Sequence, residues 1–251
     1  MAISITGAET SSSGSSSTAT ESSSTGEPPL DPTLVAWYRF EGDFEDGVED
    51  ETVNALHGAC GMGACPESVV GPIGNAAQFD GMSSVVVADD PLLHTEDAVS
   101  VAAWVRIDSF DHVLNLAIAN KVVGADNFNT WELFLGPGLG PDSDQLQWEL
   151  FGDMARSHTV VFQTTTPAGA WFHVVGVWEP KVASLYVDGE LVGSEPSLSA
   201  LTFDDGDVHI GSDLDFGEQG NFLFGALDEV RIYARALGED EVLALYELGA
   251  P

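Results

Sequence analysis

The chain has 251 residues, of which 44% are hydrophobic, and its 41 acidic residues against 7 basic ones give a net charge of −34. A surface this negative repels nucleic-acid phosphates and anionic lipid headgroups. The sequence contains no basic patch that could overcome this repulsion, so it excludes nucleic-acid binding. Bound divalent cations or saline surroundings would offset the repulsion among the acids themselves.

The N-terminal segment is of low complexity. Residues 9–27 hold thirteen Ser or Thr among nineteen positions, and Pro28, Pro29 and Pro32 follow. Such a segment buries no apolar surface, so we expect a disordered tether over residues 1–32 and one folded domain over residues 33–251. An inert tail is the alternative to a tether.

Export is expected from this tether, because Ser/Thr-rich tethers commonly follow a secretion or lipoprotein signal. Met1–Gly7 is too short to be a signal peptide, and no apolar run is long enough to span a membrane. We therefore expect a signal upstream of this sequence and an extracellular or cell-surface location.

The remainder of the chain predicts strand after strand, with Gly, Pro, Asp and Asn in the gaps. Asp188-Gly189 between two β-branched runs predicts a two-residue hairpin turn. The order of the late strands favours an all-β, two-sheet antiparallel sandwich of the jelly-roll type. Predicted strands lie near residues 34–41, 74–80, 83–88, 98–107, 113–121, 130–135, 145–151, 158–164, 171–178, 182–188, 190–194, 207–211 and 222–233.

Two segments depart from the strand pattern. Residues 42–73 are acidic and Gly-rich, which predicts a long irregular loop. Near the end, acids at the start of Glu239–Leu248 and apolar Val242, Leu245 and Tyr246 at i, i+3, i+4 spacing predict a short helix.

The only two cysteines, Cys60 and Cys65, lie in C-G-M-G-A-C within this loop. Half of a zinc site is disfavoured, because there is no second cysteine pair and four residues separate the two. In an exported protein we expect a local disulfide that pins the loop. Two free thiols are the alternative.

Six pieces of sequence lie in order along the chain: LVAWYRFE (Leu34–Glu41), GNAAQFDGMSSVVV (Gly74–Val87), VSVAAWVR (Val99–Arg106), WFHVVGVW (Trp171–Trp178), SLYVDGELVGS (Ser184–Ser194) and GALDEVRIYARAL (Gly225–Leu237). In this order they resemble the laminin-G-like, concanavalin-A-like jelly-roll domains of exported bacterial proteins. The resemblance implies the fold. It does not choose among lectins, adhesins and glycosidases, because jelly rolls host all three.

The resemblance also implies cation sites. Related domains often hold a structural calcium ion where the first and last strands pair, which here points to Glu41, Asp43 and Asp228. Carboxylate and carbonyl oxygens are the ligands that Ca²⁺ prefers. Laminin-G modules also place a calcium-dependent ligand site on a sandwich rim, for which Asp213 and Asp215 in G-S-D-L-D-F-G are the best-spaced pair. For the first set, the alternative is that Asp228 only accepts hydrogen bonds from a neighbouring turn and that Glu41 and Asp43 are solvated. For the second set, the alternative is a pair of solvated loop acids.

Aromatic residues beside amides are candidates for sugar recognition. Trp131 and Trp148, with Asn127 and Asn129 nearby, would stack on and hydrogen-bond to a sugar; Phe128 and Phe216 are further aromatic candidates. The alternative is that the tryptophans face the core, as most tryptophans in such strands do.

No catalytic pair is evident. The E-x-D-x-x-E strand of related glucanases is absent, and Glu132 and Glu149 each stand alone in W-E-L-F. We therefore expect a monomeric, non-catalytic extracellular module that binds a glycan or a cell-surface protein and carries structural Ca²⁺. The alternatives are a glycoside hydrolase or polysaccharide lyase with an unrecognised site, and a structural protein-interaction domain of the cell surface.

Overall fold

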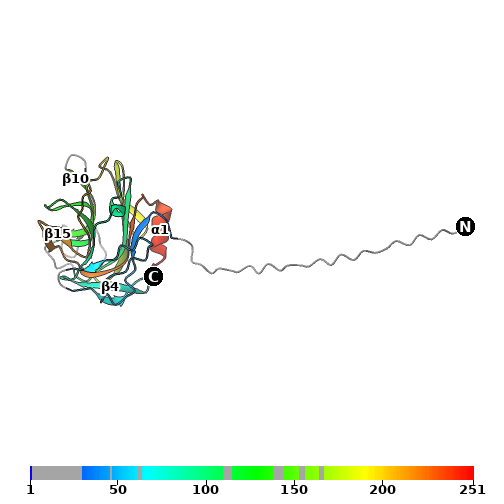
Figure 1. Cartoon of the computed structure of the whole chain (residues 1–251), viewed down its shortest axis with the longest axis horizontal. Coiled ribbons are helices and arrows are strands. Elements are labelled where there is room, and N and C mark those ends of the chain that lie inside the picture. The colour runs from blue at the N-terminus through cyan, green and yellow to red at the C-terminus, as the bar shows by residue number, and fades with distance from the viewer. Residues whose placement is uncertain are drawn as a thin grey trace.

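Two antiparallel sheets face one another across a shared hydrophobic core, as the sequence predicts (Figure 1). The computed structural model describes Met1 and residues 30–45, 47–61, 64–109, 115–137, 144–152, 156–163 and 167–251. Most of the predicted tether therefore lies outside the described residues. Within these ranges, no helix is long and apolar enough to cross a membrane.

The first sheet has eight strands. Seven follow the order β13-β12-β11-β6-β17-β4-β3, and β1 pairs with β17. Their bounds are β1 Leu34–Tyr38, β3 Glu67–Val70, β4 Asn75–Asp80, β6 Val99–Ile107, β11 Trp171–Glu179, β12 Val182–Val187, β13 Glu190–Pro196 and β17 Phe224–Tyr233.

The second sheet has seven strands in the order β10-β9-β8-β7-β14-β5-β2. Their bounds are β2 Ala59–Cys60, β5 Val85–Val87, β7 Leu116–Val123, β8 Phe128–Pro137, β9 Asp144–Gly152, β10 Arg156–Gln163 and β14 Val208–Ile210. A separate hairpin joins β15 (Asp213–Asp215) to β16 (Glu218–Gly220), and a short 3₁₀ helix, η1, spans Pro91–Leu93.

Strand β17 is the junction of the first sheet. It pairs with β6 on one side, and on the other side with β4 through its first half and with β1 through its second half. A bulge between Asp228 and Arg231, where Glu229 has φ of +54°, interrupts the register. Such a bulge re-aims side chains. The predicted pairing of the first and last strands is confirmed.

The core is filled by every second residue of each strand, as in any sheet with one buried face. Trp131 and Leu133 of the seven-stranded sheet and Val101 of the eight-stranded sheet are completely buried. Trp148 lies directly against Gly176 of β11, where a Cβ would overlap the indole ring. Gly176 therefore leaves the space that the largest core side chain of β9 needs.

The segment predicted as an irregular loop is partly ordered. It contributes β2 and β3, one to each sheet, and Cys60 and Cys65 form the expected disulfide. Short strands in acidic, Gly-rich sequence carry little apolar alternation, which is why the pattern did not reveal them.

The predicted helix is present as α1 (Glu239–Glu247). Val242 is fully buried in a second apolar cluster on the outer face of the eight-stranded sheet, together with Ala102, Val175 and Tyr186. In Figure 1, α1 (red) lies against the strands beside the blue β1. The helix thus covers the part of this sheet that would otherwise expose an apolar face.

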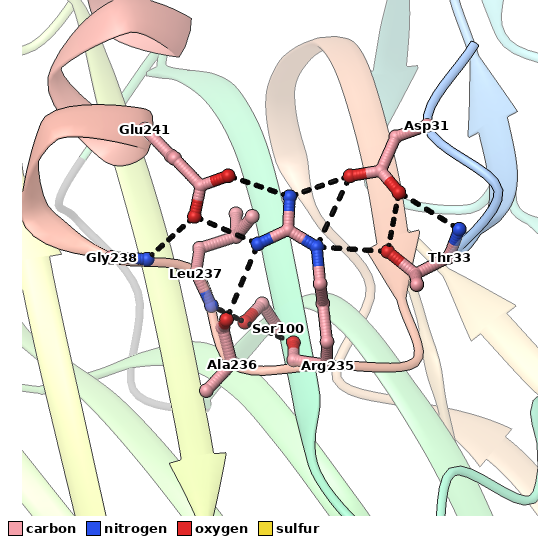
Figure 2. A network of polar contacts seen from close by, with 8 residues as sticks. All are labelled: Asp31, Thr33, Ser100, Arg235, Ala236, Leu237, Gly238 and Glu241. Carbon is pink, nitrogen blue, oxygen red and sulfur yellow. Dashed lines mark hydrogen bonds and ion pairs between the residues drawn. The ribbon is translucent and has the colours of Figure 1, made fainter.

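Arg235 joins the two ends of the domain (Figure 2). Its guanidinium donates hydrogen bonds to Asp31 and Thr33 at the entry to β1, and two bonds of 2.7 Å to Glu241 in the first turn of α1. Hydrogen bonds from Arg235 lower the pKa of Glu241. For Asp31, burial raises the pKa, but the bonds from Thr33 and Arg235 outweigh it and the net shift is downward.

We expect Arg235→Ala to lower the free energy of unfolding by about 1–2 kcal/mol, because two charge-assisted contacts at a partly exposed position are lost. Both partner carboxylates have lowered pKa values, so their contribution is present above about pH 4 and is lost as the pH falls further. Urea unfolding at pH 7 and pH 3 measures this.

The control for the Arg235→Ala prediction is the matched pair of variants Glu241→Gln and Glu239→Gln. Both residues are first-turn acids of α1, but only Glu241 contacts Arg235. Equal destabilisation by the two variants would contradict the role given to Arg235.

Candidate functional site

A polar cluster lies on the outer face of the seven-stranded sheet. Glu132 of β8 and Glu149 of β9 are directly paired across the two strands. Each stands between two inward-facing core residues, so both carboxylates point to the outer face. The sequence analysis treated them as isolated acids. The repeated W-E-L-F in successive strands was the signal that could have paired them.

Asn129 links this pair to the β15 hairpin. Its Nδ2 donates hydrogen bonds of 3.1 Å to Glu132 Oε2 and to Asp213 Oδ1. The two accepting oxygens therefore lie within about 6 Å of one another. Asn129, Glu132 and Asp213 are 5%, 7% and 3% exposed, so this is a nearly dry contact. We call Asn129, Glu132, Glu149, Asp213 and Asp215 the outer-face cluster.

Burial and mutual repulsion disfavour the ionised forms of the carboxyl groups in the outer-face cluster. Burial first, and then the Asp213 carboxylate, raise the pKa of Glu132 well above its usual range. Burial and Asp213 also raise the pKa values of Glu149 and Asp215, although hydrogen bonds from Thr159 and Ser157 partly oppose the shift at Glu149. The cluster therefore favours any ligand that brings positive charge or hydrogen-bond donors.

Two hydrogen-bond acceptors without partners also favour a ligand that brings donors. Asn129 Oδ1 and Glu132 Oε1 are buried and have no partner among the described residues. Both atoms are acceptors, and a buried acceptor without a donor costs about 1–3 kcal/mol. No group of three or more His, Cys, Asp or Glu side chains in the described part of the chain is arranged to hold a metal ion. A cation here would need amide and hydroxyl oxygens beside two carboxylates.

Aromatic side chains border the cluster. Phe128 and Phe151 stack with ring centroids 4.4 Å apart, and Phe151 is two residues from Glu149 on the same face of β9. Phe216 directly follows Asp215 and is 68% exposed; its N–H donates to Asp126 in the neighbouring turn. Apolar rings beside polar acceptors suit a ligand with both kinds of surface.

Two of the predicted binding residues have another role. Trp131 and Trp148 are 0% exposed and face the core, with their ring centroids 6.3 Å apart. The expectation that they stack on a ligand is corrected, because inward alternation on β8 and β9 places them between the sheets. Asn127 lies in an exposed turn, whereas Asn129 is part of the outer-face cluster.

The second predicted site lies where the chain ends meet, and we call Glu41, Asp228 and the loop of residues 71–75 the seam. Asp228 is fully buried and its Oδ2 accepts from Ile73 N, while Glu41 Oε2 accepts from Asn75 N. A Cβ on Gly71 or Gly74 would clash with the Asp228 or the Glu41 carboxylate, respectively. Both acids therefore lie against the same loop.

Asp43 takes a different position from its two predicted partners. Its Oδ1 accepts from Glu45 N at 3.3 Å, and with Glu41 it lines a hollow of about 310 Å³. Asp228 Oδ1 remains buried without a partner among the described residues. The structure thus brings Glu41 and Asp228 together and leaves Asp43 in its own turn.

Sequence comparison matches residues 79–243 to the family Laminin_G_3, described as the concanavalin A-like lectin/glucanases superfamily. The chain belongs to this superfamily. No curated protein shows significant sequence similarity to it. For a concanavalin A-like domain, the two-sheet architecture and the paired chain ends are the expected features.

Solved structures with the same fold include several binding domains. Domain 4 of AbnA, a GH43 extracellular arabinanase from Geobacillus stearothermophilus solved in complex with arabinotriose, matches at TM-score 0.64 and 20% identity over 85% of this chain and 98% of its own. The binding domain of Paraclostridial Mosquitocidal Protein 1 matches at 0.67 and 17%, over 85% of this chain and 52% of its own.

The receptor binding domain of botulinum neurotoxin mosaic serotype C/D matches at TM-score 0.62 and 16% identity, over 86% of this chain and 50% of its own. The chain thus spans about half the length of the two toxin domains and nearly all of the arabinanase domain. At these identities the likeness shows the fold alone.

The pH dependence of stability tests the environment of Asp228. Burial, and then the Glu229 and Glu41 charges, raise the pKa of Asp228 to about 7 against the bond from Ile73. Because the folded state binds the Asp228 proton more tightly than the unfolded state does, this proton adds to the free energy of unfolding. The contribution is fully present below about pH 4 and is lost as the pH rises toward 7. We expect this to amount to on the order of 3–4 kcal/mol.

Asp228→Asn removes this titration and keeps the shape of the side chain. Urea unfolding in EDTA at pH 5 and pH 8 should therefore show a smaller loss of stability with pH in the variant than in the wild type. Identical losses in the two proteins would contradict the described environment.

Proposed function

We propose that the chain is a non-catalytic, extracellular carbohydrate-binding module whose ligand binds at the outer-face cluster. The observation that carries this proposal is a pair of buried acceptors, Asn129 Oδ1 and Glu132 Oε1, that have no partner among the described residues. They lie beside the stacked rings of Phe128 and Phe151. A sugar supplies hydroxyl donors for such acceptors and apolar C–H faces for such rings. Few other ligand classes offer both on one small face.

The fold comparison supports the same ligand class. The arabinanase domain, which was solved with arabinotriose, is matched over 98% of its length. The acidic surface is compatible with a neutral glycan, which carries no charge for it to repel. The disulfide between Cys60 and Cys65 is consistent with an oxidising, extracellular setting. A monomer on a surface tether would present the outer face to an insoluble polymer.

We further propose a structural calcium ion at the seam, held by Glu41 and Asp228 with backbone carbonyls of the adjoining loop. The residues fit such an ion, because Asp228 Oδ1 is a buried oxygen without a partner among the described residues. Gly71 and Gly74 also let the loop backbone lie directly against the two carboxylates. Calcium prefers six to eight oxygen ligands, so carbonyls and water would complete the shell. The ion would hold the 71–75 loop against β17.

Asp213 and Asp215 are a second proposed place for a cation. Burial, and then the Asp213 charge, raise the pKa of Asp215, as expected for two carboxylates that lie close together. A cation there would neutralise the outer-face cluster and present open coordination positions to sugar hydroxyls.

Glycoside hydrolysis is a second candidate function, favoured by the direct pairing of Glu132 with Glu149. Directly opposed residues have Cβ atoms about 4.5–5.5 Å apart, close to the carboxyl separation of retaining glycosidases. Binding is preferred, because Glu132 is held by the hydrogen bond from Asn129 and the sequence lacks the E-x-D-x-x-E strand of related glucanases. A cell-surface receptor as ligand is the remaining alternative, in line with the toxin receptor-binding domains.

Calorimetry with arabinotriose and a panel of plant and microbial oligosaccharides tests the binding proposal. We expect at least one glycan to bind, and Asp215→Asn and Phe216→Ala each to weaken its affinity at least 5-fold, because a half-buried acceptor or an exposed stacking ring is removed. Asp240→Asn in α1, on the other sheet, should leave the affinity unchanged.

Two outcomes would overturn this proposal. One is the absence of binding to every glycan. The other is the release of reducing ends from a bound polymer, abolished by Glu149→Gln, which would establish the hydrolase instead.

Calcium should stabilise the wild type. At about 100-fold above the dissociation constant, we expect the melting temperature to rise by about 5–10 °C. Asp228→Asn should lose most of this rise. Sodium chloride at matched ionic strength separates specific binding from charge screening. An equal response of both proteins to calcium would exclude the seam as the site.

A further inference from the structure

A separate pocket of about 480 Å³ lies on the outer face of the eight-stranded sheet, on the side opposite to the outer-face cluster. Its lining is mostly apolar. Trp104 of β6 and Trp171 of β11 form it together with Pro72, Ala170 and the segment Gly249–Pro251. A volume of this size falls within the roughly 300–1,000 Å³ of small-molecule sites. We call it the tryptophan pocket.

The tryptophan pocket contains an unmet donor. Trp104 is 2% exposed, and its Nε1 has no acceptor among the described residues. A Cβ on Gly249 would lie 2.9 Å from this nitrogen, so the segment that lines the pocket packs directly against this part of the indole. An indole N–H normally finds a partner when buried. A ligand oxygen in the pocket would supply the missing acceptor.

His173 adds a second unpaired group beside the first. It is paired with Trp104 across β6 and β11, its ring centroid lies 5.3 Å from that of Trp104, and neither ring nitrogen has a partner among the described residues. Burial, and then the Arg231 charge, lower the pKa of His173 to about 3, so the imidazole is neutral. A neutral imidazole offers one donor and one acceptor.

Charged groups lie next to the pocket. The Arg106 guanidinium stacks 5.3 Å from the centre of the Trp171 ring and pairs with Asp108 at 3.0 Å. An apolar lining with few polar groups at its base and rim is typical of sites that bind a small amphipathic ring. Trp104 lines the pocket itself and His173 lies behind it, so a hydroxyl oxygen that accepts from the indole N–H suits the site better than a purely apolar ligand or a cation.

We propose that the tryptophan pocket binds a single sugar ring as a second saccharide site. The ring stacks on Trp171 and an oxygen of the sugar accepts from Trp104 Nε1. This inference rests on the proposed function for its ligand class, but it uses none of the same residues. With sites on opposite sheets, one module cross-links two glycan chains or grips one chain at two points, which raises its avidity.

The experiment measures binding of arabinotriose and of single sugars (arabinose, galactose, glucose, mannose, xylose and N-acetylglucosamine) by ligand-detected NMR and calorimetry. Asp215→Asn lowers the affinity of the outer-face cluster at least 5-fold, so a sugar that binds this variant with unchanged affinity occupies the other site. We expect at least one sugar to bind this variant still, and Trp171→Ala to weaken that remaining binding at least 10-fold. Trp104→Phe keeps an aromatic ring and removes only the N–H, so it should weaken the binding about 3- to 10-fold.

Ala170→Phe is the control for a variant that loses sugar binding only because it misfolds. It adds bulk to the pocket wall and removes no contact, so it should block the sugar while the melting temperature stays near that of the wild type. Binding in the Asp215→Asn background that survives both Trp171→Ala and Ala170→Phe would overturn the pocket. Binding that Asp215→Asn alone abolishes would also overturn it, yet would leave the proposed function intact. No binding of any sugar would refute both.

Discussion

The structure depends on one constraint: the last strand, β17, pairs with both β1 and β4 from the N-terminal half of the chain. Because β17 pairs with β4 through its first half and with β1 through its second half, β1 and β4 lie along the same edge of β17. The bulge at Glu229 then places the carboxylate of Glu229 on the outer face. There it accepts from Trp37 Nε1 at 2.7 Å and pairs with Arg39 and Arg231. The same strand delivers Asp228 to the 71–75 loop, so the seam follows from the strand pairing.

The distribution of the few basic residues explains why the outer-face cluster is short of positive charge. Among the side chains that the structure describes, five basic residues form ion pairs within the fold: Arg39, Arg106, Lys121, Arg231 and Arg235. Lys121 is completely buried, and its ammonium donates to Asp89 Oδ1 at 2.8 Å and to the carbonyls of Asp204 and Gly206. Asp89 and the two carbonyls thus satisfy a buried cation. Among the described residues no cation contacts Glu132 or Asp213, so the pKa of the buried Glu132 carboxyl stays raised.

The sequence predicted features whose signal is local. The Asp188-Gly189 turn, the closing strand, the disulfide and α1 each depend on a few neighbouring residues, and all are present. The pairing of Glu132 with Glu149 was missed because it depends on the register across the β8–β9 hairpin, which spacing alone does not fix. The same register turns Trp131 inward. The tryptophan pocket could not be predicted from the sequence either, because Pro72, Trp104 and Gly249 come from three distant segments of the chain.

The seam and the tryptophan pocket share a wall. Pro72 lines the pocket, and its neighbours on both sides touch the seam: Gly71 lies against the Asp228 carboxylate, and Ile73 N donates to Asp228 Oδ2. Trp104 is also the direct cross-strand partner of Asp228 on β6. The loop that lines the pocket through Pro72 is thus held to Asp228 by the hydrogen bond from Ile73. Since a cation at the seam and a sugar in the pocket would contact the same loop, any effect of one on the binding of the other would be reciprocal.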